Sequence, residues 1–390
     1  DELAGRAGAR ALTFGDLWLG PGADGPADPA VLRDRAANPA LRVINLALMT
    51  TDLTSRRPFR LPFAVAEDQD ERWQFCPRCL DGLVPARVVD QLSEAGATDQ
   101  RCPRHDTVSL HWLPQPWDLP VVLAARMSLS MPALICPVPL YRRGAVHWFS
   151  DGGITSNFPI HFFDALLPRW PTFGLNLESL DGGIPDGAEV SLPEQDATRP
   201  RLPWTRLGPG MAGLVGGILN TFLDWRDSTQ SALPGFRGRI ANVRQGAGEG
   251  GLNLFMPPRV IATLALRGHR AGELLKQRFT SGEDEAPGLT QTDRYRWIRM
   301  RLALREYREL AFQARARAPL YRPGTTTYPI PGVLARWFGE DAGPWPMVEP
   351  HTASIEATLD VLDGLADTHL AGPLDGTPPI DPILRLTPPE

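Results

Sequence analysis

The stretch Trp148-Phe149-Ser150-Asp151-Gly152-Gly153-Ile154-Thr155-Ser156-Asn157-Phe158-Pro159-Ile160 decides how we interpret the fold, because a strand delivers a single carboxylate into a glycine turn there. Residues 145–149 are predicted to form a short buried strand that leads to Asp151. The two glycines that follow let the backbone turn sharply and approach a neighbouring group. Open α/β sheets bind ligands beyond the carboxyl ends of their strands, so Asp151 is a candidate site residue. An ordinary Asp-Gly turn is the alternative.

The composition is that of a globular protein long enough to bury a large core. The chain has 390 residues, of which 43% are hydrophobic, and a formal net charge of −5 at pH 7. This charge gives no support for binding to nucleic acid. No apolar run is long enough to predict a transmembrane helix, and the first residues lack the layout of a signal peptide. We therefore expect a cytoplasmic protein, with peripheral membrane association as an alternative.

Predicted strands and helices alternate along most of the chain. The nearly continuous apolar run at residues 42–51 fits a parallel strand covered on both faces, and residues 58–63 alternate like an edge strand. Residues 12–18 are interpreted as the tail of an element that begins upstream. Further strands are predicted at residues 171–177 and 239–244, and helices at residues 84–95, 119–131, 211–227, 257–279, 293–317 and 354–366. The expected fold is α/β, with a mostly parallel sheet flanked by helices and a helical C-terminal addition.

Two tight Cys/His pairs stand out between the strand predicted at residues 58–63 and the helix predicted at residues 119–131. Cys76-Pro77-Arg78-Cys79 and Cys102-Pro103-Arg104-His105 form a C-x2-C…C-x2-H pattern with 22 residues between its halves. Two such turns can present four ligands tetrahedrally, as structural zinc requires. The alternatives are a disulfide, if the protein is exported, and unpaired buried cysteines. We predict a structural zinc ion held by Cys76, Cys79, Cys102 and His105, which clamps a small insertion at residues 64–118.

Three segments together carry a resemblance to a known family. They are residues 44–54, residues 124–132 and the Asp-Gly-Gly segment at residues 151–160. In order and spacing they resemble the patatin-like phospholipases, which are lipid acyl hydrolases with a Ser–Asp dyad. The resemblance spans roughly residues 12–280. It implies a patatin-like α/β domain at residues 1–280, followed by a helical, Pro-rich extension at residues 281–390.

The resemblance implies hydrolysis of a lipid or another acyl ester, without a cofactor for catalysis. In the family a serine on a Gly-x-Ser-x-Gly elbow attacks the ester carbonyl, and the aspartate of Asp-Gly-Gly takes its proton directly. Asp151 would be that base, and Gly152, Gly153 and Asn157 would belong to the active-site turn. Backbone N–H groups of a glycine-rich loop would hold the oxyanion.

This sequence departs from the family pattern in one respect that concerns catalysis. None of its serines lies in Gly-x-Ser-x-Gly, and the residues before position 42 contain neither the elbow nor the glycine-rich loop. The interpretations are a truncated sequence, a separate N-terminal part that carries the nucleophile, or an inactive homologue. We favour truncation, because the sequence does not start with Met. The chain alone is then expected to be inactive. The competing function is a catalytically inactive scaffold that binds lipid or a partner and contains structural zinc.

Overall fold

The computed structural model describes residues 10–21, 28–66, 68–132, 134–156, 158–165, 167–179, 187–193, 236–246, 255–281 and 290–321, together with isolated residues at 210–217, 249, 253 and 357–364. The chain splits into two compact units, which we describe separately. Unit 1 contains Asp1–Phe162, and unit 2 contains Phe163–Pro203 and Thr229–Thr387. The predicted domain at residues 1–280 and the predicted extension at residues 281–390 stay predictions.

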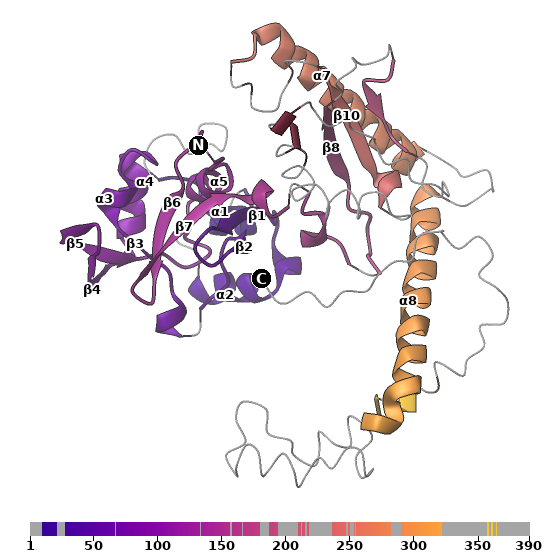
Figure 1. The fold of residues 1–390 in the computed structure, drawn as a ribbon, viewed down its shortest axis with the longest axis horizontal. Coiled ribbons are helices and arrows are strands. Elements are labelled where there is room, and N and C mark those ends of the chain that lie inside the picture. Colours follow the sequence, from indigo (N-terminus) through magenta and orange to yellow (C-terminus); the bar gives the residue numbers. More distant parts are fainter. Residues whose placement is uncertain are drawn as a thin grey trace. The chain divides into compact units, whose positions relative to one another are not determined.

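Unit 1 is built on a seven-stranded sheet with the strand order β2-β1-β7-β6-β3-β5-β4 (Figure 1). Its strands are β1 (Leu48–Asp52), β2 (Arg57–Leu61), β3 (Gln74–Phe75), β4 (Ala97–Cys102), β5 (His105–Trp112), β6 (Val138–Arg142) and β7 (Ala145–Asp151). Every pair of neighbouring strands in this sheet is antiparallel. The fold is α/β as expected, but the prediction of a mostly parallel sheet was wrong.

The physical reason for the antiparallel order is visible at the β6–β7 turn. Arg143 and Gly144 join these strands with φ values of 51° and 74°. Two-residue hairpin turns of this kind need positive φ at both central positions, and they return the chain antiparallel to itself. The sequence analysis placed no strand at β6, so it missed the hairpin that delivers Asp151.

Helices pack on the sheet of unit 1, and two of them begin at a capping side chain. The structure confirms two predicted helices, at α4 (Ala86–Ser93) and at α5 (Val121–Ser128), and α5 packs against β1 and β7. The N-terminal helix α1 (Phe14–Leu19) starts within this chain, because Thr13 and Asp16 form a reciprocal capping box. Residues 12–18 are therefore not the tail of an upstream element. The remaining helices of unit 1 are α2 (Pro29–Ala37) and the short α3 (Pro77–Leu80).

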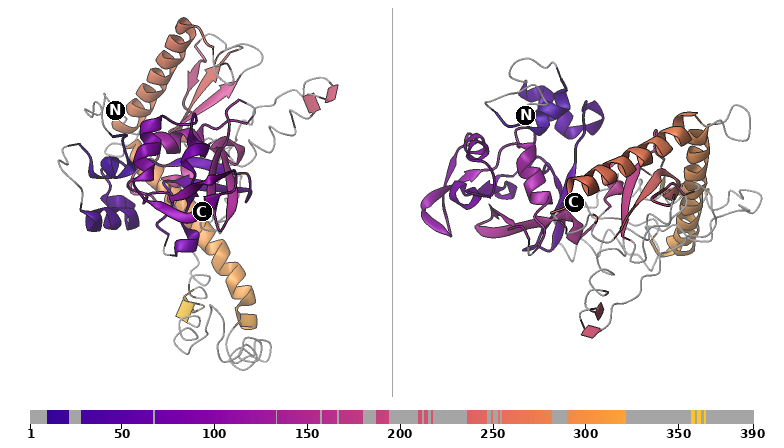
Figure 2. Two further views of the ribbon diagram at one scale, coloured as in Figure 1. Left: turned by 90° about the vertical axis from the view of Figure 1, so that its left-hand side faces the viewer. Right: turned by 90° about the horizontal axis from the view of Figure 1, so that it is seen from above.

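Unit 2 contains a three-stranded sheet with the order β8-β10-β9. Its strands are β8 (Gly174–Ser179), β9 (Val190–Ser191) and β10 (Ile240–Gln245), and the β8–β10 pair is parallel. Helix α7 (Pro258–Lys276) packs on this sheet, and Ala271 and Leu275 share a core with Val243 (Figures 1 and 2). The helix predicted at residues 293–317 is α8 (Gln291–Tyr321). The helices predicted at residues 211–227 and 354–366 lie mostly outside the described residues.

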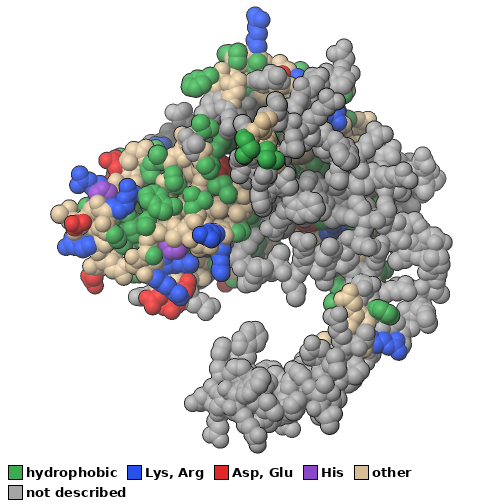
Figure 3. All heavy atoms as spheres, viewed as in Figure 1, with side chains coloured by type: hydrophobic (Ala, Val, Ile, Leu, Met, Phe, Trp, Pro, Cys, Tyr) green, Lys and Arg blue, Asp and Glu red, His purple; other side chains and the backbone are tan. Residues whose placement is uncertain are grey.

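Among the described residues, no helix has the length and apolar character that crossing a membrane would need. Figure 3 shows basic and acidic side chains interspersed with hydrophobic ones on the described part of one face. Neither sign of charge dominates that part of the surface.

Candidate metal centre and the Asp151 turn

The four predicted metal ligands meet in unit 1, and one atom of each lies within 4.8 Å of the others. Cys76 precedes α3 and Cys79 lies within it, so a single helical turn carries the first pair. Cys102 ends β4 and His105 starts β5, so the β4–β5 turn carries the second pair. All three cysteines are buried and His105 is partly buried. A buried group of three thiols and an imidazole could hold a metal ion.

The His105 nitrogen lies at similar distances from the three sulfurs. Nδ1 of His105 lies 3.7 Å from Cys76 Sγ, 3.4 Å from Cys79 Sγ and 3.8 Å from Cys102 Sγ. The sulfurs of Cys79 and Cys102 are 3.8 Å apart, and all the cysteines are free thiols. A disulfide needs a sulfur separation of about 2.05 Å, so the structure does not contain the disulfide alternative.

Burial and hydrogen bonding raise the pKa of two of the three thiols and lower the pKa of the third. Burial raises the pKa of Cys76 to about 12, and it also raises the pKa of Cys79. Burial likewise opposes ionisation of Cys102, but hydrogen bonds from Tyr141, from the Arg104 backbone N–H and from His105 outweigh it and lower that pKa to about 6. Three thiolates therefore cannot gather here at neutral pH unless a positive charge compensates them.

Tyr141 is a part of the site that the sequence analysis missed. Its hydroxyl lies 3.2 Å from Cys79 Sγ and 3.3 Å from Cys102 Sγ, and its side chain is fully buried. Burial raises the pKa of the Tyr141 hydroxyl, so it stays protonated and can donate. Tyr141 lies on β6, a strand that the sequence analysis did not predict, so no signal in the sequence connected it with the cysteines.

The Asp151 turn lies at the end of β7, as predicted. Asp151 caps the short 3-10 helix Gly152–Ile154, and its Oδ1 accepts a hydrogen bond of 2.6 Å from the Gly153 N–H. The Asp151 N–H donates to the Ser130 carbonyl oxygen at 3.0 Å, which ties the turn to the end of α5. The carboxylate is half-buried. Hydrogen bonds to Gly153 and to Ser130 therefore hold Asp151 in place.

Gly152 packs against β1 more closely than any other residue type would allow. A Cβ at this position would overlap the Met49 carbonyl oxygen. The glycine is thus required by the close approach of two backbones, as the sequence suggested for this turn. Asn157, the last predicted residue of the turn, lies outside the described residues.

The serines near Asp151 in sequence have partners of their own. Ser150 Oγ donates to the Ser130 carbonyl oxygen at 2.7 Å, and Ser130 Oγ donates to the Arg126 carbonyl oxygen at 2.7 Å. Both side chains are buried. In the described part of the chain, no serine hydroxyl is recorded in a hydrogen bond with the Asp151 carboxylate. Within those residues, the candidate base is therefore not hydrogen-bonded to a serine hydroxyl.

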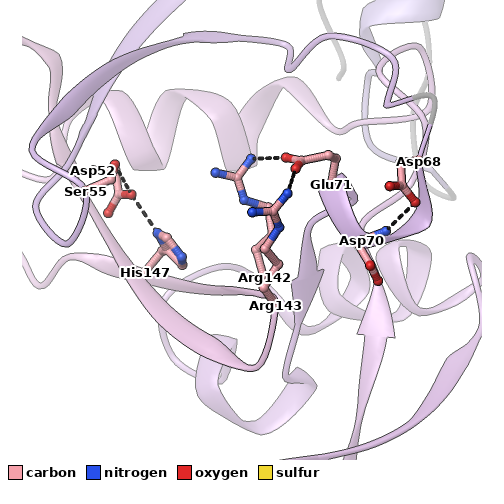
Figure 4. A network of polar contacts seen from close by, with 8 residues as sticks. All are labelled: Asp52, Ser55, Asp68, Asp70, Glu71, Arg142, Arg143 and His147. Carbon is pink, nitrogen blue, oxygen red and sulfur yellow. Dashed lines mark hydrogen bonds and ion pairs between the residues drawn. The ribbon is translucent and has the colours of Figure 1, made fainter. Parts of the chain in front are cut away.

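A hydrogen-bonded group around Asp52, drawn in Figure 4, joins β1 to β7. Oδ2 of the fully buried Asp52 lies 2.7 Å from Nδ1 of His147 and accepts a hydrogen bond of 2.6 Å from Ser55 Oγ. Burial opposes ionisation of Asp52, but these bonds and one from the Thr54 N–H outweigh it and lower its pKa. Sequence reasoning missed this pair, because its members are far apart in the chain.

Comparison with known proteins finds a related curated protein. No protein-family model matches the sequence, and no solved structure matches it. The chain is 34% identical to a protein of Rhizobium meliloti (strain 1021) described as "RpoH suppressor". The match covers 70% of this chain and 48% of the relative, so the chain spans about half the length of that curated protein. The relative's description names neither an activity nor a substrate.

Proposed function

We propose that this chain supplies Asp151 as the general base of a lipid acyl hydrolase of the Ser–Asp type. The observation that supports the proposal is the placement of a half-buried carboxylate at the end of β7, on a turn that Gly152 packs against β1. Oδ1 is held by the Gly153 N–H, and within the described residues no partner is recorded for Oδ2. That oxygen is the one that would accept a proton.

The proposed chemistry needs a serine from outside the described residues. The serine oxygen attacks the ester carbonyl carbon while its proton moves to the Asp151 carboxylate. The protonated Asp151 then gives this proton to the departing alcohol, and an acyl-serine remains. In the second half of the reaction, water attacks the acyl carbon while Asp151 takes a proton from the water. Asp151 then gives this proton to the departing serine oxygen, which restores the serine hydroxyl. Oδ2 of Asp151 accepts and returns one proton in each half, so the aspartate ends unchanged.

The test compares this chain with a longer natural protein that includes a Gly-x-Ser-x-Gly segment. We expect the longer protein to hydrolyse a short-chain nitrophenyl ester and this chain alone to do so no faster than buffer. Asp151→Asn in the longer protein should lower turnover by about 10²- to 10⁴-fold, the range for a positioned acid–base group. The exposed Asp34→Asn should leave turnover unchanged.

Two outcomes would contradict this proposal in different ways. Full turnover in Asp151→Asn would remove Asp151 from the mechanism. If this chain alone hydrolyses the ester and Asp151→Asn abolishes that turnover, Asp151 is the base but the serine lies within these 390 residues. If the longer protein binds lipid vesicles without hydrolysing any ester, the competing function, a non-catalytic scaffold, is correct.

The second part of the proposal is that the Cys/His group holds a structural zinc ion. Tetrahedral zinc, with Zn–S bonds of about 2.3 Å and Zn–N bonds of about 2.0 Å, puts two sulfurs about 3.8 Å apart and a sulfur and a nitrogen about 3.5 Å apart. The Cys79–Cys102 sulfur separation is 3.8 Å, and the His105 Nδ1 separations run from 3.4 to 3.8 Å. Four protein ligands fill a tetrahedral site, so the role is structural rather than catalytic.

Metal analysis of the purified protein tests this part. We expect about one zinc ion per chain, as one tetrahedral site requires. Cys79→Ser should lose the zinc, whereas Cys136→Ser, which changes an exposed cysteine outside the group, should keep it. A zinc content far below one per chain in the unmodified protein, purified without chelator, contradicts the assignment.

A further inference from the structure

Tyr141 reaches from the central sheet to both halves of the Cys/His group. Its hydroxyl lies 3.2 Å from Cys79 Sγ, in the first pair, and 3.3 Å from Cys102 Sγ, in the second. The Tyr141 side chain has no exposed surface. A buried hydroxyl without a partner destabilises the folded state, and these two sulfurs are the partners of the Tyr141 hydroxyl.

The charge of a loaded site explains why such a donor is needed. A zinc dication with three thiolates and a neutral imidazole carries one net negative charge. The three cysteines are between 0% and 9% exposed, so water cannot solvate that charge well. In the part of the chain that the structure describes, Tyr141 is the side chain outside the four ligands that is recorded within hydrogen-bond reach of their sulfurs.

The strand that carries Tyr141 also connects the group with the rest of the sheet. Tyr141 pairs with Val146 on β7 and with Gln74 on β3. Cys76 follows β3 directly, and Cys102 and His105 lie on the β4–β5 turn. The Tyr141 phenol therefore joins the Cys/His group to β6. The neighbouring strand β7 carries Asp151.

We propose that Tyr141 is a positioning residue of the metal centre, whose hydroxyl donates to the Cys79 and Cys102 thiolates and fixes the two ligand pairs at the separation that the metal needs. This inference rests on the proposed metal centre. A single proton serves two sulfurs, so it is shared between them or alternates. Groups that hydrogen-bond to metal ligands typically change metal affinity by about 10- to 100-fold when they are removed.

The test compares Tyr141→Phe with Tyr295→Phe in the full chain. Tyr295 is a matched control, because it is also buried and its hydroxyl has no recorded partner among the described residues. Competition with a chromophoric chelator gives the apparent zinc affinity of each protein. We expect Tyr141→Phe to weaken zinc binding about 10- to 100-fold and Tyr295→Phe to leave it within a factor of about two.

A second readout separates donation to sulfur from a loss of packing. In the cobalt(II)-loaded protein, Tyr141→Phe should move the sulfur-to-cobalt charge-transfer bands to lower energy, because a thiolate that loses a hydrogen bond gives up its electrons more easily. Unchanged affinity and unchanged bands in Tyr141→Phe would overturn the inference while leaving the metal centre intact. An unmodified protein that binds no zinc would overturn both.

Cadmium-113 NMR of the unmodified protein tests the hydrogen bond even if Tyr141→Phe does not fold. In the unmodified protein loaded with cadmium-113, a hydrogen bond to a ligand sulfur couples the hydroxyl proton to the metal nucleus. A phenolic proton correlated with cadmium supports the donation. A cadmium-loaded protein in which every detected phenolic proton lacks this correlation overturns it.

Discussion

Nδ1 of His147 on β7 lies 2.7 Å from Oδ2 of the fully buried Asp52 on β1, so a charge-assisted hydrogen bond joins the two strands on which the Asp151 turn rests. Thr50 of β1 is paired directly with Asp151, two residues along from Asp52. The Asp52–His147 contact thus holds the register that places Asp151 next to β1. The stability of these strands should depend on it.

Replacing Asp52 with Asn should destabilise unit 1. The change removes the carboxylate that accepts from His147, Ser55 and the Thr54 N–H, and it leaves these donors poorly matched in a buried place. Hydrogen bonds to charged groups are worth about 1.5–3 kcal/mol, so we expect the free energy of unfolding to fall by about 2–3 kcal/mol. Urea denaturation measures it. Asp99→Asn, an exposed change, should alter stability by less than about 0.5 kcal/mol.

The contribution of Asp52 should vanish in acid. Its pKa is lowered in the folded protein, so the folded state favours the charged carboxylate. The resulting stability is fully present above the ordinary pKa of an aspartate, about 3.9, and is lost as the pH falls through the lowered folded value. The gap in unfolding free energy between the unmodified protein and Asp52→Asn should therefore narrow below about pH 4. A gap that widens on acidification would mean that the sign of the shift is wrong.

Adding one methyl group at Gly152 should disturb the Asp151 turn. The new Cβ would meet the Met49 carbonyl oxygen, which belongs to the backbone of β1 and cannot rotate away. We expect Gly152→Ala to cost about 1–3 kcal/mol of stability, as overpacking does. Gly268→Ala lies in open space within α7 and should instead be neutral or stabilising by up to about 1 kcal/mol. Thermal unfolding of both variants checks the contrast.

Removing the metal should loosen one part of unit 1 and leave unit 2 unchanged. Cys76, Cys79 and Cys102 make a small core with Leu110 and Tyr141, separate from the main core of the unit. Once a chelator has removed the ion, amide hydrogen exchange should accelerate along β4 and β5, while α7 keeps its rate. Equal exchange along β4 and β5 with and without metal would show that the ion does not stabilise this core.

Unit 2 depends on a buried carboxylate that serves two arginines. Asp164 Oδ2 lies 2.9 Å from Arg239 and 3.2 Å from Arg299, and all three side chains are less than 10% exposed. Asp164→Asn leaves both guanidinium groups without that charge, and breaking a buried pair in this way costs about 3–5 kcal/mol. Urea denaturation should show a loss near this size, against little change for Glu273→Gln, whose side chain is 65% exposed. A loss below about 1 kcal/mol would mean that other groups neutralise the arginines.

Local patterns predicted several elements and the meeting of the Cys/His group, but they did not predict the strands β3 to β6. The spacing of apolar residues predicted α4 and α5, because a helix must turn one stripe toward the core. The repeated Cys-Pro-Arg turns predicted that Cys76, Cys79, Cys102 and His105 meet, because two such turns can present four ligands to one metal ion. The Asp-Gly-Gly segment predicted a strand that ends in a tight turn, and β7 ends there.

Strand direction and long-range partners were decided only by the tertiary structure. An apolar, β-branched run such as β1 shows that both faces are covered, but it does not show whether its neighbour runs parallel or antiparallel. The β6–β7 hairpin settled that direction for this sheet, and it also brought Tyr141 to the cysteines. Asp52 and His147 are 95 positions apart, and no periodicity connects residues at such a separation. The sequence therefore predicted amphipathic helices and tight turns, because these depend on residues that are close together in the chain. Which side chains face one another depends on how the strands pair, and that is a property of the whole packed sheet.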